Sequence, residues 1–273
     1  MIGTPATYVT EEQDTLLDIA RDHDVGYVAI RAANPGIDPW LPGAGKVVTL
    51  PTQHLLPDAP HRGIVINLPE LRLYYYPAKG EIRTFPIGIG GEGKETPVGR
   101  TQIANKRPHP VWVPTKSEHE EEPDLPASVG PGPDNPMGDY ALYLGWKGYA
   151  MHGTNKPYSI GRRDSHGCIR LYPEDIEWLY HEAAIGTPVT VVNQPAKVGW
   201  SSGELFLEVN PTQDDVDALE VEGVPNSSEG IDADDLVAKA AGADAPRLDW
   251  YTIHLAEIRR GGVPVQVTRP VPY

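Results

Sequence analysis

Glycine and proline punctuate this chain so often that few of its helices or strands can be long. Of 273 residues, 28 are glycine and 29 are proline. Together they make about a fifth of the chain, well above their usual share and without a collagen period. Both residues interrupt regular structure and favour turns. The chain is therefore predicted to be mostly β, because short strands between turns fit that pattern.

Strand-like runs recur through the middle of the chain. They cover residues 63–68, 71–76, 82–87, 101–105, 141–146, 149–151 and 189–192. One helix interrupts them, with Pro173 at its expected first position and Gly186 at its expected end. We therefore predict a β sandwich or barrel with one or two helices.

The C-terminal part has mixed character and no catalytic pattern. Its expected elements are a strand at 204–209, an acidic loop at 212–235, a short helix at 234–241, an ordered strand or helix at 250–258 and a surface tail at 267–273. We predict an α+β annex over residues 194–273, whose role the sequence leaves open.

Charge and cysteine content exclude several classes of protein. The chain has 23 Lys and Arg against 38 Asp and Glu, a net charge of −15. This argues against a general nucleic-acid binder, which needs a basic face. No apolar run approaches the roughly 18–20 residues of a transmembrane segment. The lone cysteine, Cys168, rules out an internal disulfide and any multi-cysteine metal cluster.

Residues 6–51 are predicted to fold in the order strand, helix, helix, strand. The informative residues are Tyr8, Val9, Asp14, Thr15, Leu16, Ile19, Ala20, Ala33, Asn34, Pro35, Val48, Thr49, Leu50 and Pro51. They resemble a LysM module, a small βααβ domain that binds the glycan of peptidoglycan or chitin, although Gln13 replaces its usual glycine. The resemblance predicts a peptidoglycan-binding module, with a linker over 52–62. The alternative is a helical hairpin that only packs against its neighbour.

Residues 151–171 hold the groups that can carry chemistry. A thiol needs a base or a cation to become the reactive thiolate, and a nearby histidine can take that proton and return it. His166 lies two residues from Cys168, so on a strand their side chains would share a face. His152 ends a neighbouring strand. Gly153 and Gly167 leave the backbone open to a substrate, and N–H groups around Gly167 could form an oxyanion hole.

The same segment is locally basic within an acidic chain. The segment contains four basic residues and one acidic residue: Lys156, Arg162, Arg163, Arg170 and Asp164. This excess favours an anionic ligand, and carboxylates are the groups onto which arginine forks. Two aromatic residues, Tyr158 and Trp112, are candidates for lining a substrate groove. We therefore predict a thiol nucleophile site that binds a carboxylate-bearing substrate.

One motif makes the prediction specific. His152, followed after a gap by Ser165-His166-Gly167-Cys168-Ile169-Arg170, is similar to the signature of the L,D-transpeptidase (YkuD-like) catalytic domain. The similarity extends over residues 63–193 and includes Thr96-Pro97-Val98-Gly99 and residues 131–136. It implies an L,D-transpeptidase-type β sandwich or barrel for this domain.

The resemblance also implies a role for each residue of the motif. Cys168 is the nucleophile that forms a thioester, and His152 is the general base, with its ring oriented by the carbonyl of Gly153. His166 lies beside the thiol and assists or positions it, and the N–H groups of His166, Gly167 and Cys168 stabilise the oxyanion. Arg170 binds the substrate or supports the loop. Ser165 shapes the turn.

The implied substrate is peptidoglycan. Cys168 would attack the diaminopimelate carbonyl of a tetrapeptide donor stem and expel the terminal D-Ala. The amine of a second stem would then give a 3→3 crosslink, a lysine of an outer-membrane lipoprotein would give protein attachment, and water would make the enzyme an L,D-carboxypeptidase. The same thiol serves all three acceptors. Family members of this kind are inactivated by carbapenems.

This chemistry implies no metal or organic cofactor. It also implies a periplasmic location, because mature peptidoglycan lies outside the inner membrane. The first ten residues have neither a basic start nor an apolar core, so the export signal is expected to be missing from this sequence.

Two hypotheses of other classes stand beside this one. A zinc hydrolase would use His152, His166 and Cys168 as ligands, although no carboxylate base stands at a recognisable spacing. A non-catalytic wall-binding protein would rest on the LysM-like module alone. The acidic run at 118–122 is expected to be a loop rather than a metal site, within a segment (114–138) long enough to form a lid over the site.

Overall fold

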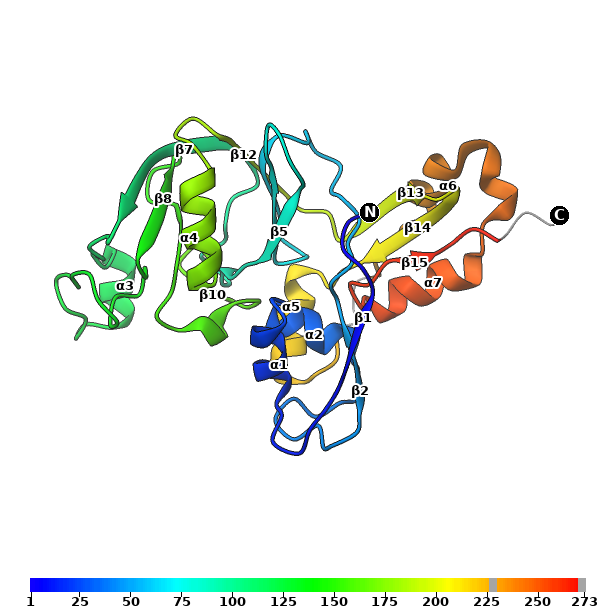
Figure 1. The fold of residues 1–273 in the computed structure, drawn as a ribbon, viewed down its shortest axis with the longest axis horizontal. Helices are drawn as coiled ribbons and strands as arrows, with labels where there is room; N and C mark the ends of the chain where they lie inside the picture. The colour runs from blue at the N-terminus through cyan, green and yellow to red at the C-terminus, as the bar shows by residue number, and fades with distance from the viewer. Residues whose placement is uncertain (226–229, 270–273) are drawn as a thin grey trace. The chain divides into compact units, whose positions relative to one another are not determined.

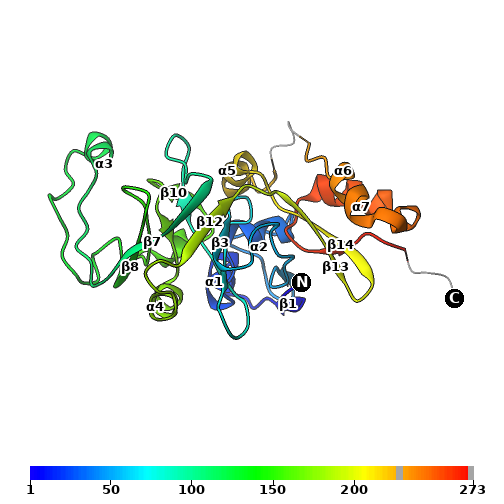
Figure 2. The same ribbon diagram turned by 90° about the horizontal axis from the view of Figure 1, so that it is seen from above.

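The computed structural model describes residues 1–225 and 230–269 and divides the chain into two compact units. Unit 1 combines Met1–Ala59, Asn67–Glu70 and Asn193–Tyr273, and unit 2 combines Pro60–Ile66 and Leu71–Val192. Figures 1 and 2 show their elements. The residues expected to form the LysM-like module and those expected to form the annex therefore fall in one unit.

Unit 2 is built on an eight-stranded sheet with the order β11-β9-β8-β7-β12-β3-β4-β5. Its strands are β3 (Gly63–Asn67), β4 (Arg72–Tyr76), β5 (Arg83–Pro86), β7 (Gly99–Pro108), β8 (Tyr140–Leu144), β9 (Ala150–His152), β11 (Ile169–Arg170) and β12 (Pro188–Val192). The edge strand β11 pairs parallel with β9, and β9 pairs antiparallel with β8. The mostly β prediction for this region is confirmed. Strand β7 extends beyond the predicted 101–105 at both ends, and β11 falls in none of the predicted runs.

Smaller elements complete unit 2. The short strands β6 (Ile89–Gly90) and β10 (Arg163–Ser165) pair in parallel, and a 3-10 turn η1 covers Pro157–Ser159. The predicted helix is α4 (Pro173–Glu182), which packs against β8 with Ile176 and Leu179 buried; Figure 1 shows it beside that strand.

The acidic run at 118–122 is not the loop that the sequence predicts. It lies largely in a helix, α3 (Lys116–Glu121). The Thr115 side chain accepts from the backbone N–H of Glu118, and the Glu118 carboxylate accepts from the N–H of Thr115. This capping box satisfies two N–H groups at the helix start, so the Thr-x-x-Glu spacing outweighs charge repulsion along the run.

The first part of unit 1 has the expected order of strand, helix, helix, strand. Its elements are β1 (Ala6–Val9), α1 (Leu16–Asp22), α2 (Tyr27–Ala33) and β2 (Val47–Leu50). The strands pair antiparallel. Leu16, Ile19, Ile30 and Val48 are buried together between helices and strands, because the apolar positions of both helices recur on one face.

The C-terminal part of unit 1 is an α+β arrangement. Its elements are β13 (Ala196–Ser201), β14 (Glu204–Val209), α5 (Gln213–Val221), α6 (Asp234–Ala241), the 3-10 segment η2 (Gly242–Arg247), α7 (Trp250–Arg259) and β15 (Val265–Gln266). The three strands form one sheet in the order β13-β14-β15. Nowhere in the described ranges is a helix long and apolar enough to cross a membrane.

Two predictions for this part were wrong. The stretch expected to be an acidic loop over 212–235 contains α5, where Thr212 and Asp215 cap the helix start reciprocally. The residues expected to begin a surface tail are inside, since Val267 is fully buried and Thr268 is 4% exposed. The rest of that tail, residues 270–273, lies outside the described residues, as do residues 226–229 of the expected loop.

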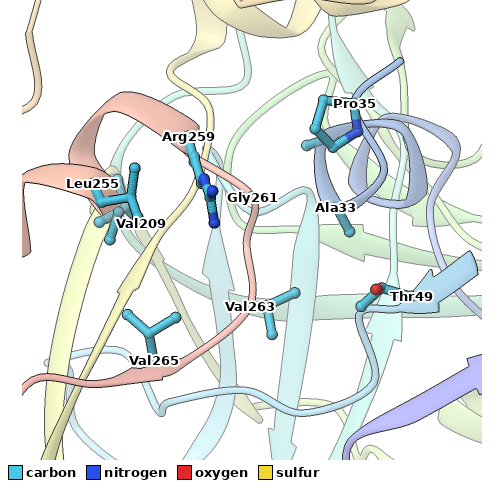
Figure 3. Close-up of a pocket in the computed structure, with 11 residues that line it drawn as sticks. Ala33, Pro35, Thr49, Val209, Leu255, Arg259, Gly261, Val263 and Val265 are labelled. Atoms are coloured by element: carbon cyan, nitrogen blue, oxygen red, sulfur yellow. The ribbon is translucent and has the colours of Figure 1, made fainter. Parts of the chain in front are cut away.

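A pocket of about 360 Å³ opens within unit 1. Figure 3 shows Ala33, Pro35 and Thr49 on one side of it and Val209, Leu255, Arg259, Gly261, Val263 and Val265 on the other. Its lining is mainly small and apolar. Residues from α2 and β2 therefore line the pocket together with residues from α7 and the C-terminal sheet.

A buried ionic cluster lies at the centre of unit 1. Lys197 on β13 stands directly opposite Glu208 on β14, and its Nζ lies 2.9 Å from Glu208 Oε1 and 2.7 Å from Glu70 Oε1. Lys197 also donates to the carbonyl of Leu55 at 2.7 Å. Burial raises the pKa of Glu70, but Lys197 and His54 lower it by more, so its net pKa lies well below the usual range.

Replacing Lys197 with methionine is expected to lower the free energy of unfolding by about 3–5 kcal/mol, because two buried carboxylates lose the cation between them. Urea unfolding at pH 7 measures the loss. Lys46→Met, at an exposed lysine of the same unit, is the control and should change stability little. Equal effects of the two substitutions would contradict the stabilising role of the cluster.

Candidate active site

Strands β9 and β11 position the candidate nucleophile and base. The parallel pairing places Arg170 opposite His152 and Ile169 opposite Met151. The three residues before β11, 166–168, form a bend rather than a strand. The expected shared strand face of His166 and Cys168 is therefore absent, because Gly167 adopts a φ of +97° and turns the backbone between them.

His152 is buried at the end of β9, with 6% of its surface exposed. Its Nδ1 lies 2.6 Å from the carbonyl oxygen of Gly153. A carbonyl only accepts, so Nδ1 carries the proton and Nε2 is the basic nitrogen. Burial, and then the charge of Arg170, lower the pKa of His152 to about 4. The ring is therefore a neutral imidazole at pH 7, able to accept a proton.

Cys168 is half-buried beside Gly148, which precedes β9, and Ala150, which begins it. Its thiol donates to the carbonyl of Gly148 at 3.7 Å, and its side chain packs against a cluster that includes Met137, Ala141 and Ala150. Burial raises the pKa of Cys168, and Glu118 raises it further. Within residues 1–225 and 230–269, no hydrogen bond joins this thiol to the His152 ring.

Two hydroxyl groups fix the bend that carries the thiol. Ser165 Oγ donates to the carbonyl of Cys168 at 2.6 Å and accepts from the N–H of Gly167 at 3.2 Å. Thr96 Oγ1 donates to the carbonyl of Gly167 at 2.9 Å and accepts from the N–H of Gly90 at 3.1 Å. The N–H of Gly167, expected as an oxyanion donor, is thus engaged inside the bend in this conformation.

Gly167→Ala is expected to disrupt the site. The new Cβ would lie 2.8 Å from Cε1 of Tyr149 at a φ that side chains rarely adopt, and such strain costs about 1–3 kcal/mol. Urea unfolding and the rate of Cys168 alkylation by iodoacetamide would measure the effect. Gly186→Ala separates the two causes, because its φ is +88° but nothing lies within 4 Å of its Cβ. If both variants change the stability and the alkylation rate of Cys168 equally, the clash with Tyr149 is unimportant.

The ring of His166 lies among charged groups. Its Nε2 is 2.8 Å from Lys94 Nζ and 3.1 Å from Glu121 Oε2, and its Nδ1 is 3.7 Å from Glu118 Oε1. Lys94 and Glu121 also form an ion pair. Nε2 therefore lies between a cation and a carboxylate, and Nδ1 faces a second carboxylate.

Sequence reasoning missed Lys94, which stands in the glycine-rich run between β6 and β7 and belongs to no recognisable motif. It also missed the contact of α3 with His166, because the acidic run was expected to be a loop. The capping pair Thr115 and Glu118 was the available signal for that helix.

The remaining predicted residues lie in different elements of unit 2. Arg170 donates to Asp164 Oδ1 at 2.7 Å, which braces the strand before the bend. Trp112 packs against the same small cluster as Cys168 and exchanges backbone hydrogen bonds with Val129. Tyr158 lies on η1 with 48% of its surface exposed, and its carbonyl accepts from Arg162.

The structure does not assemble the zinc site of the alternative hypothesis. In the part of the chain that is described, the groups of three or more His, Cys, Asp or Glu with ligand atoms within 4.8 Å of one another are His54–Glu70–Glu208 and Asp234–His254–Glu257. His152, His166 and Cys168 do not form such a group. In the first group, moreover, Lys197 already places its ammonium against both carboxylates.

The fold and the site together define a class: a mostly β domain with a buried neutral histidine at the end of β9 and a cysteine just before the adjacent edge strand β11. The family model for the L,D-transpeptidase catalytic domain (YkuD) matches residues 61–191. The chain is 43% identical over 229 residues to "Probable L,D-transpeptidase YcfS" of Escherichia coli, covering 80% of this chain and 72% of that protein. The chain belongs to the L,D-transpeptidase family.

Two further comparisons describe the extent of the likeness. The chain is 46% identical over 199 residues to "Probable L,D-transpeptidase YbiS" of Escherichia coli, covering 70% of this chain and 64% of that protein, so it spans less than two thirds of that relative. The NMR structure of the catalytic domain from the Enterococcus faecium L,D-transpeptidase aligns over 50% of this chain and all of that domain, with 23% identity and a TM-score of 0.39.

Proposed function

We propose that this protein is a peptidoglycan L,D-transpeptidase in which Cys168 is the nucleophile and His152 the general base. The observation that carries the proposal is the state of His152: its Nδ1–H is held by the Gly153 carbonyl at 2.6 Å, and its low pKa leaves it neutral. His152 ends β9, and β9 pairs with β11, which begins directly after Cys168. A neutral imidazole at this position can accept the proton of the thiol.

The proposed first half-reaction forms a thioester. Nε2 of His152 takes the thiol proton as Sγ attacks the carbonyl of diaminopimelate in the donor tetrapeptide. The bond to the terminal D-Ala breaks, and its nitrogen receives the proton from His152. The N–H of Cys168 stabilises the oxyanion. The N–H of Gly167 can join it only if the bond to Ser165 opens.

The second half-reaction transfers the acyl group to an acceptor amine. That amine attacks the thioester and loses a proton to His152, and His152 passes this proton to the departing thiolate, which restores the thiol. A stem-peptide amine gives a 3→3 crosslink, a lipoprotein lysine gives protein attachment, and water gives a free tripeptide. We assign substrate binding to Arg170, Ser165, Trp112 and Tyr158, and inactivation by carbapenems through the same thiol follows from this mechanism. We place this reaction in the periplasm.

Mass spectrometry of products tests the proposal. Purified protein is incubated with disaccharide-tetrapeptide, with a Cys168→Ala sample in parallel. Loss of terminal D-Ala in the wild type alone is the expected result; crosslinked dimers then identify a transpeptidase and free tripeptides a carboxypeptidase. Cleavage by both proteins would refute Cys168 as the nucleophile, and cleavage by neither would favour a wall-binding role without catalysis.

The pH dependence is expected to reflect two shifted groups. Because burial raises the pKa of Cys168, alkylation by iodoacetamide should keep rising with pH through 9 rather than level off near neutrality. Because the pKa of His152 is about 4, donor turnover should persist at pH 5 and fall near pH 4, where the imidazole becomes charged. An alkylation plateau by pH 7 would instead indicate a preformed thiolate–imidazolium pair.

We further propose that residues 6–51 are a LysM-like glycan-binding module, with residues 52–62 as linker, 63–193 as catalytic domain and 194–273 as an extension. The βααβ order and the exposed side chain of Trp40, 56% accessible, support this. Co-sedimentation with purified peptidoglycan sacculi tests it, with Trp40→Ala expected to weaken binding and His23→Ala, elsewhere on the same module, expected to leave it unchanged. Equal binding by all three proteins would contradict it.

A further inference from the structure

Charge rather than apolar packing holds helix α3 in place. None of its six residues is buried. Glu121 pairs with Lys94 and lies 3.1 Å from Nε2 of His166, and Glu118 lies 3.7 Å from Nδ1 of the same ring. By contrast, Glu120 pairs at 3.2 Å with Lys116, whose side chain is 91% exposed. Two carboxylates of α3 therefore face the site and one faces solvent.

The position that Glu121 occupies borders the nucleophile. His166 stands two residues before Cys168, across the bend at Gly167. The carbonyl of Lys94 would lie 3.4 Å from a Cβ at Gly167 and 2.0 Å from a Cβ at Gly90, so the backbone of Lys94 packs closely on the bend. An anion held by Lys94 and His166 is thereby held at the bend that carries Cys168.

We infer that Lys94 and His166 bind a carboxylate of the donor stem peptide, and that Glu121 occupies this site until the donor arrives. The inference rests on the proposed function, since it names a substrate contact of the same site. An incoming carboxylate replaces Glu121 one for one at Lys94 and His166. Exposed ion pairs are weak and screened by salt, so a donor can displace α3.

A carboxylate of the donor would bind the Lys94 ammonium group in the same way as the Glu121 carboxylate does. The ammonium has three donors and no acceptor, and it lowers the pKa of Glu121, with His166 adding to the effect. Glu121 is therefore an ionised carboxylate, as the carboxylates of a stem peptide are at neutral pH. Departure of α3 also removes Glu118, which raises the pKa of Cys168, so donor binding favours the thiolate.

Alkylation of Cys168 by a charged and a neutral reagent tests the inference without any turnover. The measured quantity is the ratio of the iodoacetate rate to the iodoacetamide rate at low salt. Glu121→Gln should raise the ratio about threefold to tenfold by removing repulsion of the anionic reagent, and Lys94→Met should lower it by a similar factor. Glu120→Gln makes the same change on the solvent side of α3 and should leave the ratio unchanged, while Lys94→Arg should preserve it.

Donor kinetics identify which carboxylate binds. Lys94→Met should raise KM for the tetrapeptide donor about tenfold with a smaller change in kcat, and Glu121→Gln should lower KM. Two amidated donors are compared, one at the terminal D-Ala carboxylate and one at the diaminopimelate side-chain carboxylate. The donor whose KM no longer depends on Lys94 has lost the bound carboxylate.

Either of two results overturns the inference. Equal alkylation ratios for Glu121→Gln and Glu120→Gln would show that α3 does not occupy the site. A KM that depends on Lys94 for both amidated donors would show that this residue does not bind a donor carboxylate. If the wild type releases no D-Ala, the proposed function fails, and the alkylation ratios still decide whether Glu121 occupies an anion site.

Discussion

Cys168→Ala is expected to abolish release of D-Ala from a tetrapeptide donor, lowering kcat/KM by on the order of 10⁴-fold or more. The reason is chemical: the thioester cannot form, and loss of a nucleophile typically removes nearly all of the rate enhancement. Quantifying free D-Ala against time measures the loss. The alanine leaves the hydrogen bond from Ser165 to the carbonyl of residue 168 in place, so the bend should persist.

Two controls make this result interpretable. The urea unfolding midpoints of wild type and Cys168→Ala should agree closely, because a half-buried thiol contributes little to packing. Cys168→Ser keeps a hydroxyl at the same place but should be almost as inactive, since the site is arranged for the more acidic thiol. A variant that retained a tenth of the wild-type rate would remove Cys168 from the mechanism.

His152→Ala is expected to lower donor turnover by about 10²–10⁴-fold, the usual contribution of a positioned general base. Because Cys168 has a raised pKa, little thiolate forms at pH 7 without a base. Raising the pH should therefore recover part of the lost rate in the variant. The measurement is kcat/KM between pH 6 and 10 for both proteins.

His23→Ala is the matched control for that experiment. His23 is an exposed histidine in unit 1, so its loss should change neither the rate nor its pH dependence. If His152→Ala turned over donor at the wild-type rate at pH 7, the imidazole held by Gly153 would not be the base.

Most of the fold could be predicted because the strands of unit 2 are bounded by turn residues. The order strand, helix, helix, strand in residues 6–51 could be predicted for the same kind of reason, since Asn34-Pro35-Gly36 and Pro51 follow α2 and β2. Two of the errors fell where local charge suggested a loop. In α3 and α5, a threonine cap with an acid three residues later outweighs the repulsion between neighbouring acids.

The candidate site could be predicted in composition but not in arrangement. The motif identifies His152 and Cys168, and the expected contact of the His152 ring with the Gly153 carbonyl is present. The contact of His166 with Lys94 spans 72 positions, and no local pattern encodes such a pairing. The shared strand face of His166 and Cys168 failed because alternation holds only in extended backbone, and Gly167 is not extended.

The discontinuity of unit 1 has a consequence for how the chain folds as it is synthesised. Residues 1–59 are made first, but their partners, from residue 193 onward, are made last. Residues 6–51 can bury their own apolar cluster early, but unit 1 as a whole is complete only after unit 2 has been made. Because domains fold as units from the N-terminal side during synthesis, the enzyme-like unit is expected to be finished before the unit in which the chain begins. Lys197, which arrives late, joins His54 and Glu70 only at that final stage.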